Sequence, residues 1–213
     1  MKKREYLKTK NISIIVIFII WCISVYVTFF TGFEAFWSEL QAKYTELNRE
    51  EGLVVALMPI LVVILSGIIS SALKARLIFW RRRHALPGHR VFSKLAPKDA
   101  RIDMEYLRNK IGTIPDDPKA QNTLWYRLYR KYEDGPTVKH THRNFLLARD
   151  LSTISLIFAV FGTIGLIFGS IHFKALSIYF VVMLAHYIIL SVVAQNHGNR
   201  LVCNVITEYL EDD

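Results

Sequence analysis

One histidine lies inside a stretch of the chain that is otherwise apolar. His186 falls near the middle of the run 175–194, which holds no Lys, Arg, Asp or Glu. An ionisable group at that depth in a membrane is by default a candidate for a functional role. The alternative is a neutral imidazole hydrogen-bonded to a Ser or Thr of a neighbouring helix. The sequence leaves both interpretations open.

A second group of charged side chains surrounds a Pro-Gly pair at positions 87 and 88. His84 and His89 flank this pair, and the nearby cations are Arg81, Arg82, Arg83 and Arg90. Such a turn could bind a phosphate group. Close to a bilayer, the more ordinary role of a basic cluster is attraction to anionic lipid headgroups, at about 1 kcal/mol per residue. We therefore expect these arginines to form a headgroup anchor or a ligand site.

Patterns of catalytic or metal-binding residues are missing from the sequence. His140 and His142 are two residues apart, so on a helix they point about 200° apart and cannot share a metal ion. Cys22 and Cys203 have no disulfide or metal spacing. No glycine-rich phosphate loop, nucleophile elbow or helical zinc motif occurs. We expect no catalytic residue, no metal and no cofactor, and hence a protein that is not an enzyme.

Four apolar runs predict that the chain lies in a membrane. None contains Lys, Arg, Asp or Glu, and they cover residues 12–32, 52–73, 151–170 and 175–194. About 20 helical residues, at 1.5 Å rise each, match a hydrocarbon core of roughly 30 Å. Backbone groups facing lipid must be satisfied within their own segment. The sequence thus predicts an all-α integral membrane protein with four transmembrane helices.

The charges between the runs predict the orientation. Residues 1–11 carry 5 Lys and Arg against 1 Glu, 33–51 carry 2 against 5 acidic residues, and 74–150 carry 18 against 8. The positive-inside rule places 1–11, 74–150 and the tail 195–213 in the cytoplasm, with 33–51 and the turn 171–174 outside. Apolar residues at three- and four-residue steps in 33–51 predict an amphipathic helix at the outer interface. Topology and anionic headgroups then explain the net charge of +9, and contact with nucleic acid is not expected.

The segment 74–150 is long enough for a small helical domain. We expect the second span to continue past the membrane to His84, where the Pro-Gly pair makes a turn. Thr137 is expected to cap a long helix that runs through Arg149 into the third span. Two shorter helices should lie between these extensions and cover them.

Capping residues mark the two shorter helices. Asp103 can cap a helix over 104–111, and Gly112 follows it at the position that favours a left-handed backbone. Asp117 precedes Pro118, which is a strong helix-start signal. The second helix should end at the Gly-Pro pair that begins at Gly135.

The helix after Pro118 carries an aromatic stripe. Leu124, Trp125, Leu128 and Tyr132 share one face, and basic residues lie away from it. Packing on the protein's own core is the favoured interpretation, with a membrane-interface helix and contact with nucleic acid as alternatives. As a surface for a cytoplasmic protein partner, the candidates on this helix are Trp125, Tyr126 and Arg130.

Small residues at three- and four-residue steps predict close helix packing in the membrane. Gly162, Gly165 and Gly169 form one face of the third span, and Gly67 with Ser71 forms another on the second. Such faces pack within one protomer or between protomers. With little other surface for tight association, we expect a homo-oligomer.

The layout resembles small bacterial inner-membrane components of anti-phage defence systems, such as the membrane subunit of Kiwa or the transmembrane effectors of retron and cyclic-nucleotide systems. The resemblance rests on the four spans, the short outer loops and a basic cytoplasmic insert that contains Leu86-Pro87-Gly88-His89-Arg90, Asp99-Ala100-Arg101-Ile102-Asp103 and Gln121-Asn122-Thr123-Leu124-Trp125-Tyr126. It implies a multi-pass protein of the bacterial inner membrane. It transfers no site residue.

Two functions from different classes remain. The first is a non-enzymatic sensor or effector that couples a cytoplasmic partner or ligand to the membrane. The second is a small transporter, channel or membrane enzyme that uses His186 or the arginine-rich turn. Transporters usually show repeats or broken helices with several polar residues at mid-depth. Since His186 is almost alone at that depth, the first function is favoured.

Overall fold

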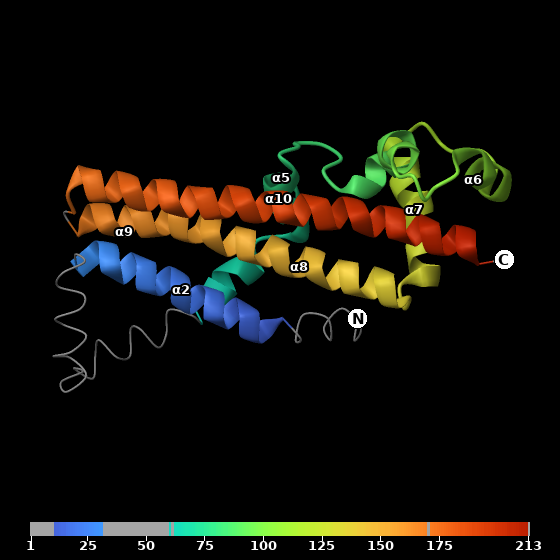
Figure 1. Ribbon diagram of the computed structural model, residues 1–213. Helices are drawn as coiled ribbons and strands as arrows, with labels where there is room; N and C mark the ends of the chain where they lie inside the picture. The colour runs from blue at the N-terminus through green and yellow to red at the C-terminus, as the bar shows by residue number, and fades with distance from the viewer. Residues whose placement is uncertain (1–10, 32–59, 61, 170, 213) are drawn as a thin grey trace. The chain divides into compact units, whose positions relative to one another are not determined.

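The protein is described by a computed structural model that covers residues 11–31, 60, 62–169 and 171–212 of the 213-residue chain (Figure 1). Every regular element in these ranges is a helix. The predicted all-α class is therefore confirmed for the described residues. The predicted amphipathic helix in 33–51 lies outside them.

Among the residues that the structure describes, three helices are long and apolar enough to cross a membrane. They are Ile12–Phe30, Pro136–Phe168 and Phe173–Glu211. A fourth span is present if Val62–Ile68 and Ser71–Phe79, which lie on either side of a break, together make one bent span. The count of four spans therefore depends on this interrupted segment.

The second apolar run is not one continuous helix. The described helix that ends at Ile68 is separated from α5 (Ser71–Phe79) by two non-helical residues, Ile69 and Ser70. The break falls in the sequence Ser-Gly-Ile-Ile-Ser-Ser, and Gly and Ser pairs are frequent sites of sharp helix distortion. The expected uninterrupted extension of this span to His84 is therefore wrong.

Helix α5 also ends earlier than its sequence suggests. The backbone N–H of Arg81 donates to the carbonyl of Arg76 at 3.3 Å, and Trp80 between them has a φ of 50°. This is the six-to-one bond of a Schellman motif, in which glycine usually occupies the left-handed position. A tryptophan there costs roughly 1–2 kcal/mol of backbone strain.

The chain divides into two compact units. The apolar unit comprises Met1–Ser70 and Asp150–Leu190, and the cap unit comprises Ser71–Arg149 and Ser191–Asp213. Two helices, α8 (Pro136–Ile157) and α10 (Phe173–Glu211), contain residues of both units without an interruption at either boundary (Figure 1).

The core of the apolar unit is formed by α2 (Ile12–Thr31), the C-terminal part of α8 with its continuation, and the N-terminal part of α10. The continuation consists of a π-helical turn, η4 (Phe158–Gly162), followed by α9 (Thr163–Phe168). A π turn leaves backbone carbonyls out of the regular ladder. Here the buried Tyr179 hydroxyl of α10 donates to the carbonyl of Phe158 at 3.0 Å, which locks α10 to the irregular turn.

The cap unit consists of short helices packed on the end of α10. Its elements after α5 are the turns η1 (Pro87–Arg90), η2 (Val91–Leu95) and η3 (Ala96–Lys98), and the helices α6 (Met104–Ile111) and α7 (Pro118–Tyr132). Their common core contains Phe92, Leu107 and Ile206. On α10, Gly198 allows close packing, because a Cβ there would lie 2.8 Å from Phe79 and 3.2 Å from Phe145.

The predicted caps of the two short helices are confirmed. Asp103 accepts hydrogen bonds from the N–H groups of Glu105 and Tyr106, and Asp117 accepts from that of Ala120 at 2.9 Å. Helix α6 has the predicted bounds, and Gly112 after it has a φ of 83°. Helix α8 begins at Pro136, so Thr137 lies inside its first turn and is not the cap.

Candidate functional site

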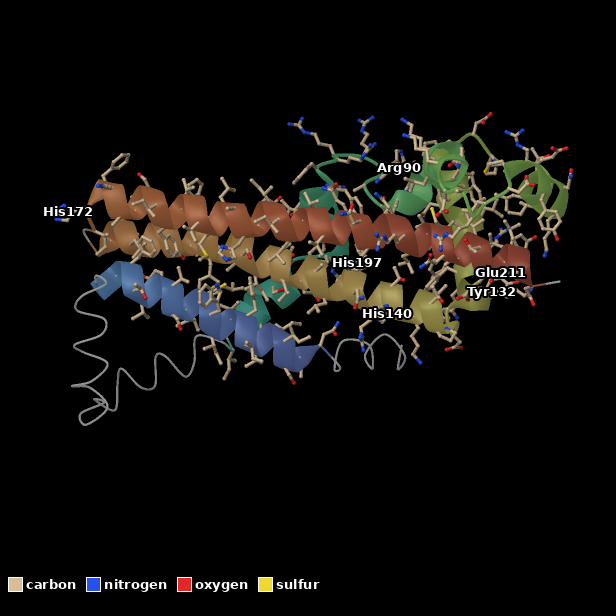
Figure 2. The ribbon with its side chains drawn as sticks, viewed as in Figure 1. Arg90, Tyr132, His140, His172, His197 and Glu211 are labelled. Carbon is tan, nitrogen blue, oxygen red and sulfur yellow. The ribbon has the colours of Figure 1, made fainter. Side chains whose placement is uncertain are left out.

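The basic turn of the cap unit holds one guanidinium group in a defined place. Arg90 donates from Nη1 to the carbonyl of Ala85 at 3.1 Å and from Nη2 to Oδ1 of Asn199 at 3.4 Å. The guanidinium carbon lies 5.4 Å from the ring centroid of Phe79, within the range of a cation–π interaction. Figure 2 shows Arg90 beside α10. These contacts orient the side chain and leave about three of its five N–H donors without a bond in the described structure.

The charged side chains of the turn are all cationic. Burial, and then the charge of Arg81, lower the pKa of Arg90 from its ordinary value. Burial is also the largest cause that lowers the pKa of His89, so this imidazole, whose ring centroid is 4.9 Å from that of His84, is mainly neutral at pH 7. Within the ranges that the structure describes, no carboxylate pairs with any of the four arginines. The turn therefore concentrates positive charge that no ion pair among the described residues neutralises, while the charge of Asp117 acts on His89.

Close packing against α7 holds the other side of the turn. Gly88 is buried, and a Cβ there would overlap the side-chain amide oxygen of Asn122 and lie 3.1 Å from Trp125. Trp125 in turn donates from Nε1 to the carbonyl of Val202 on α10 at 3.2 Å. Gly88 of the Pro-Gly pair is thus the point where η1 packs against α7. The sequence motifs 86–90 and 121–126 meet there.

A groove in the cap unit was not predicted from the sequence. It has a volume of about 720 Å³, and its lining includes Ser93, Arg108 and Gln121. Gln121 is buried; its Oε1 accepts from the Ser93 N–H and hydroxyl at 3.3 and 3.2 Å, and its Nε2 donates to the carbonyl of Asp116 at 3.3 Å. Long-range contacts of this kind have no signature in sequence spacing.

Arg101 pairs with Asp99 and not with the capping residue Asp103. Arg101 Nη2 and Nε lie 2.8 and 3.0 Å from the Asp99 carboxylate, and Nη1 donates to Asn204 Oδ1 at 3.0 Å. The hydrogen bond from Arg101 is the main cause that lowers the pKa of Asp99 to about 2. Because this pKa is lowered on folding, the pair contributes its full stability above the unfolded pKa near 4 and loses it as the pH falls towards 2. The pair is therefore a structural brace at every cellular pH.

The two neighbouring histidines of α8 lie in different environments, as their spacing predicts. His142 is buried with Nδ1 at 3.0 Å from the Tyr129 hydroxyl, whereas His140 lies on the exposed side of the helix (Figure 2). Among the described residues, no group of three or more His, Cys, Asp or Glu side chains is arranged to hold a metal ion.

His186 makes a local hydrogen bond. Its Nδ1 lies 2.8 Å from the carbonyl of Val182, one turn earlier in α10, and not against a Ser or Thr of a neighbouring helix. A carbonyl oxygen can only accept, so Nδ1 is the donor in this bond, and the bond orients the ring.

The glycines of the third span pack inside the chain. A Cβ at Gly162 would overlap the Tyr179 hydroxyl, one at Gly165 would lie 2.7 Å from the Tyr26 hydroxyl, and one at Gly169 would lie 2.7 Å from the Phe30 ring. This face is therefore covered by α2 and α10 of the same chain.

The predicted face on the second span is different. A Cβ at Gly67 meets nothing within 4 Å, and Gly67 and Ser71 are exposed. Within the described part of the chain these two residues form no tight contact.

The three residues of α7 that were predicted as a partner surface, Trp125, Tyr126 and Arg130, differ in how exposed their side chains are. Trp125 is partly buried and packs on the core of the cap unit with Leu124 and Leu128, which agrees with the favoured interpretation of the stripe. Tyr126 is 40 % exposed, and Arg130 is also exposed. Tyr126 and Arg130 therefore offer surface to a partner, whereas Trp125 holds α7 in place.

Comparisons of the chain with protein-family models, with curated proteins and with solved structures gave no match.

Proposed function

We propose that the protein is a non-enzymatic membrane sensor or effector, in which binding of a partner or ligand to the cap unit changes the packing of the apolar unit. The observation that carries this proposal is the continuity of α8 and α10, each of which contributes residues to both units. A continuous helix shared by two units is a route by which a shift or rotation in one unit can reach the other. Such coupling requires two arrangements that are favoured differently by the bound and free states.

The proposed setting is the bacterial inner membrane, with both termini and the cap unit in the cytoplasm. The distribution of Lys and Arg between the loops supports this orientation. The resemblance in layout to membrane components of anti-phage defence systems supports a role in defence, with a cytoplasmic protein partner. A homo-oligomer is part of this proposal, and we place its interface away from Gly162, Gly165 and Gly169, because each of these glycines already faces an aromatic side chain of the same chain.

The orientation predicts a specific labelling pattern. With cysteine placed at Lys94 in the cap unit or at His172 in the turn before α10, a membrane-impermeant maleimide should label the His172→Cys protein in intact cells and the Lys94→Cys protein only after lysis. Both native cysteines are buried, so their background is low. The opposite pattern would place the cap unit outside the cell.

Sensing and response are expected to depend on one residue from each unit. Trp125→Ala removes the contact that docks α7 on α10, and His186→Leu removes the oriented imidazole of the apolar unit. In cells carrying the intact gene cluster, each change should lower phage resistance by about tenfold or more, as expected when a coupling free energy of 1–3 kcal/mol is lost.

Matched changes at exposed positions, Thr123→Ala on α7 and Ile188→Leu on α10, serve as controls and should retain resistance. Blotting of membrane fractions checks that all four proteins are inserted. Full phage resistance in both the Trp125 and the His186 variants would contradict the coupling. The protein would then be a passive anchor for its partner.

A further inference from the structure

We propose that Arg90 and Arg81 form a binding site for the phosphate of an anionic phospholipid on the cytoplasmic side of the membrane. This site goes beyond the coupling function, and depends only on the membrane orientation of α10. The four arginines of the basic turn do not contribute equally to this site. The guanidinium of Arg90 is fixed by hydrogen bonds, and the charge of Arg81 acts on it.

The guanidinium of Arg90 is held in place and still has N–H donors for a further hydrogen-bond acceptor. Its contacts with Ala85, Asn199 and Phe79 fix the guanidinium, and none of these groups is an anion. Holding a half-buried cation near a second cation, Arg81, is unfavourable unless an anion compensates. The described residues provide no carboxylate partner for this guanidinium, and a phosphate oxygen would satisfy its remaining donors with charge-assisted hydrogen bonds.

The backbone around the site is held in an uncommon conformation. Trp80 and His84 both have φ of 50°, a left-handed backbone conformation that is unfavourable for residues with a Cβ. These two residues bracket Arg81, Arg82 and Arg83. Strain of this kind, maintained by the surrounding packing, is common at binding sites.

The depth of the site along α10 favours a lipid over a free anion. The apolar run of this helix ends at Ala194. Gln195, the next residue, donates to the carbonyl of Ile78 at 2.7 Å, and Asn199, which holds Arg90, lies five residues beyond Ala194, or about 7.5 Å along the axis. The headgroup layer on each side of a bilayer is roughly 5–7.5 Å thick, so Asn199 is expected at its outer edge, where the Arg90 side chain can reach lipid phosphates. Trp80, 55 % exposed, lies near the boundary where tryptophan is favoured.

A diffuse basic belt would behave differently from this site. In a belt each arginine contributes equally, because only its charge counts. Arg82 and Arg83 are exposed and have no contacts that orient them in the described structure. Arg82→Gln is therefore a matched control for Arg90→Gln, with the same change of charge in the same turn.

The test is native mass spectrometry of the purified full-length protein in detergent, with phosphatidylglycerol, phosphatidylcholine or inorganic phosphate added separately. The original chain should bind phosphatidylglycerol in preference to phosphatidylcholine. Arg90→Gln should lower its affinity for phosphatidylglycerol by about tenfold or more, as expected for loss of charge-assisted hydrogen bonds. Arg82→Gln should change it little, and Arg81→Gln should give an intermediate loss.

Equal losses in the Arg82 and Arg90 variants would overturn the site in favour of a belt. Full displacement of the lipid by millimolar inorganic phosphate would assign the site to a free anion, and absence of bound phosphatidylglycerol in the original chain would exclude it. Thermal unfolding of each variant checks the fold; if Arg90→Gln unfolds, the comparison of Arg81→Gln with Arg82→Gln decides. If the impermeant maleimide labels the Lys94→Cys protein in intact cells, the cap unit is not cytoplasmic. That result would contradict the orientation on which the site depends.

Discussion

Replacing Gly162 by leucine should destabilise the apolar unit by about 3 kcal/mol or more. Even the first added carbon would overlap the Tyr179 hydroxyl, and Tyr179 is fully buried and hydrogen-bonded to Phe158. Overpacking alone costs about 1–3 kcal/mol, and displacement of the hydroxyl adds the cost of leaving a buried polar group unpaired. Thermal unfolding in detergent, followed by intrinsic fluorescence, should show a Tm lower by about 5 °C or more.

The same substitution at Gly67 is the matched control. This glycine also lies in an apolar helical segment, but a Cβ there meets nothing within 4 Å. Gly67→Leu should therefore leave the Tm almost unchanged. If Gly162→Leu is tolerated as well as Gly67→Leu, α10 does not cover the glycine face of the third span, and that face would again be available to a second copy of the chain.

Local signals allowed the helices of the cap unit to be predicted closely. Asp103 and Asp117 can each satisfy free backbone N–H groups of the following turn, and Gly112 and Pro118 have conformations that favour a helix end and a helix start. These preferences act over three or four residues, so they are readable without the fold. The apolar helices were predictable for a similar reason, since length and composition determine which segments suit a bilayer.

The ends and breaks of the second span were not predictable in the same way. The Schellman motif at Trp80 lacks the usual glycine, so the local sequence does not mark the helix end. Ser and Gly residues near Ser70 permit a break but do not require one. The continuous apolar pattern therefore did not reveal either the break or the end of the helix.

The partners of the candidate residues could also not be read from the sequence. The sequence indicated a packing face at Gly162, but not that Tyr179 fills it. It identified Arg90 as one of four cations, but its selection depends on Asn199, which is 109 positions away in the chain. Contacts between distant segments are determined by how helices pack, and side-chain spacing within one segment carries no information about them.

The second large effect is expected when the continuity of α10 is broken near the boundary between the two units. Val193 is on the exposed side of the helix, so replacing it removes little packing. A proline there removes the hydrogen bond to the carbonyl four residues earlier and kinks or breaks the helix, at a cost of about 3 kcal/mol. Val193→Pro should therefore uncouple the units, and Val193→Ala should preserve the coupling. Val193→Gly should weaken it, because glycine is about 1 kcal/mol less favourable than alanine in a helix.

We propose that the changed packing of the apolar unit raises the ion permeability of the membrane, so the membrane potential of phage-infected cells that carry the intact gene cluster tests the coupling most directly. A voltage-sensitive dye should report depolarisation with the original chain and with Val193→Ala, a smaller change with Val193→Gly, and none with Val193→Pro, when blots show equal amounts of inserted protein. A Val193→Pro protein that is inserted normally and depolarises the membrane as the original chain does would contradict transmission through the shared helix.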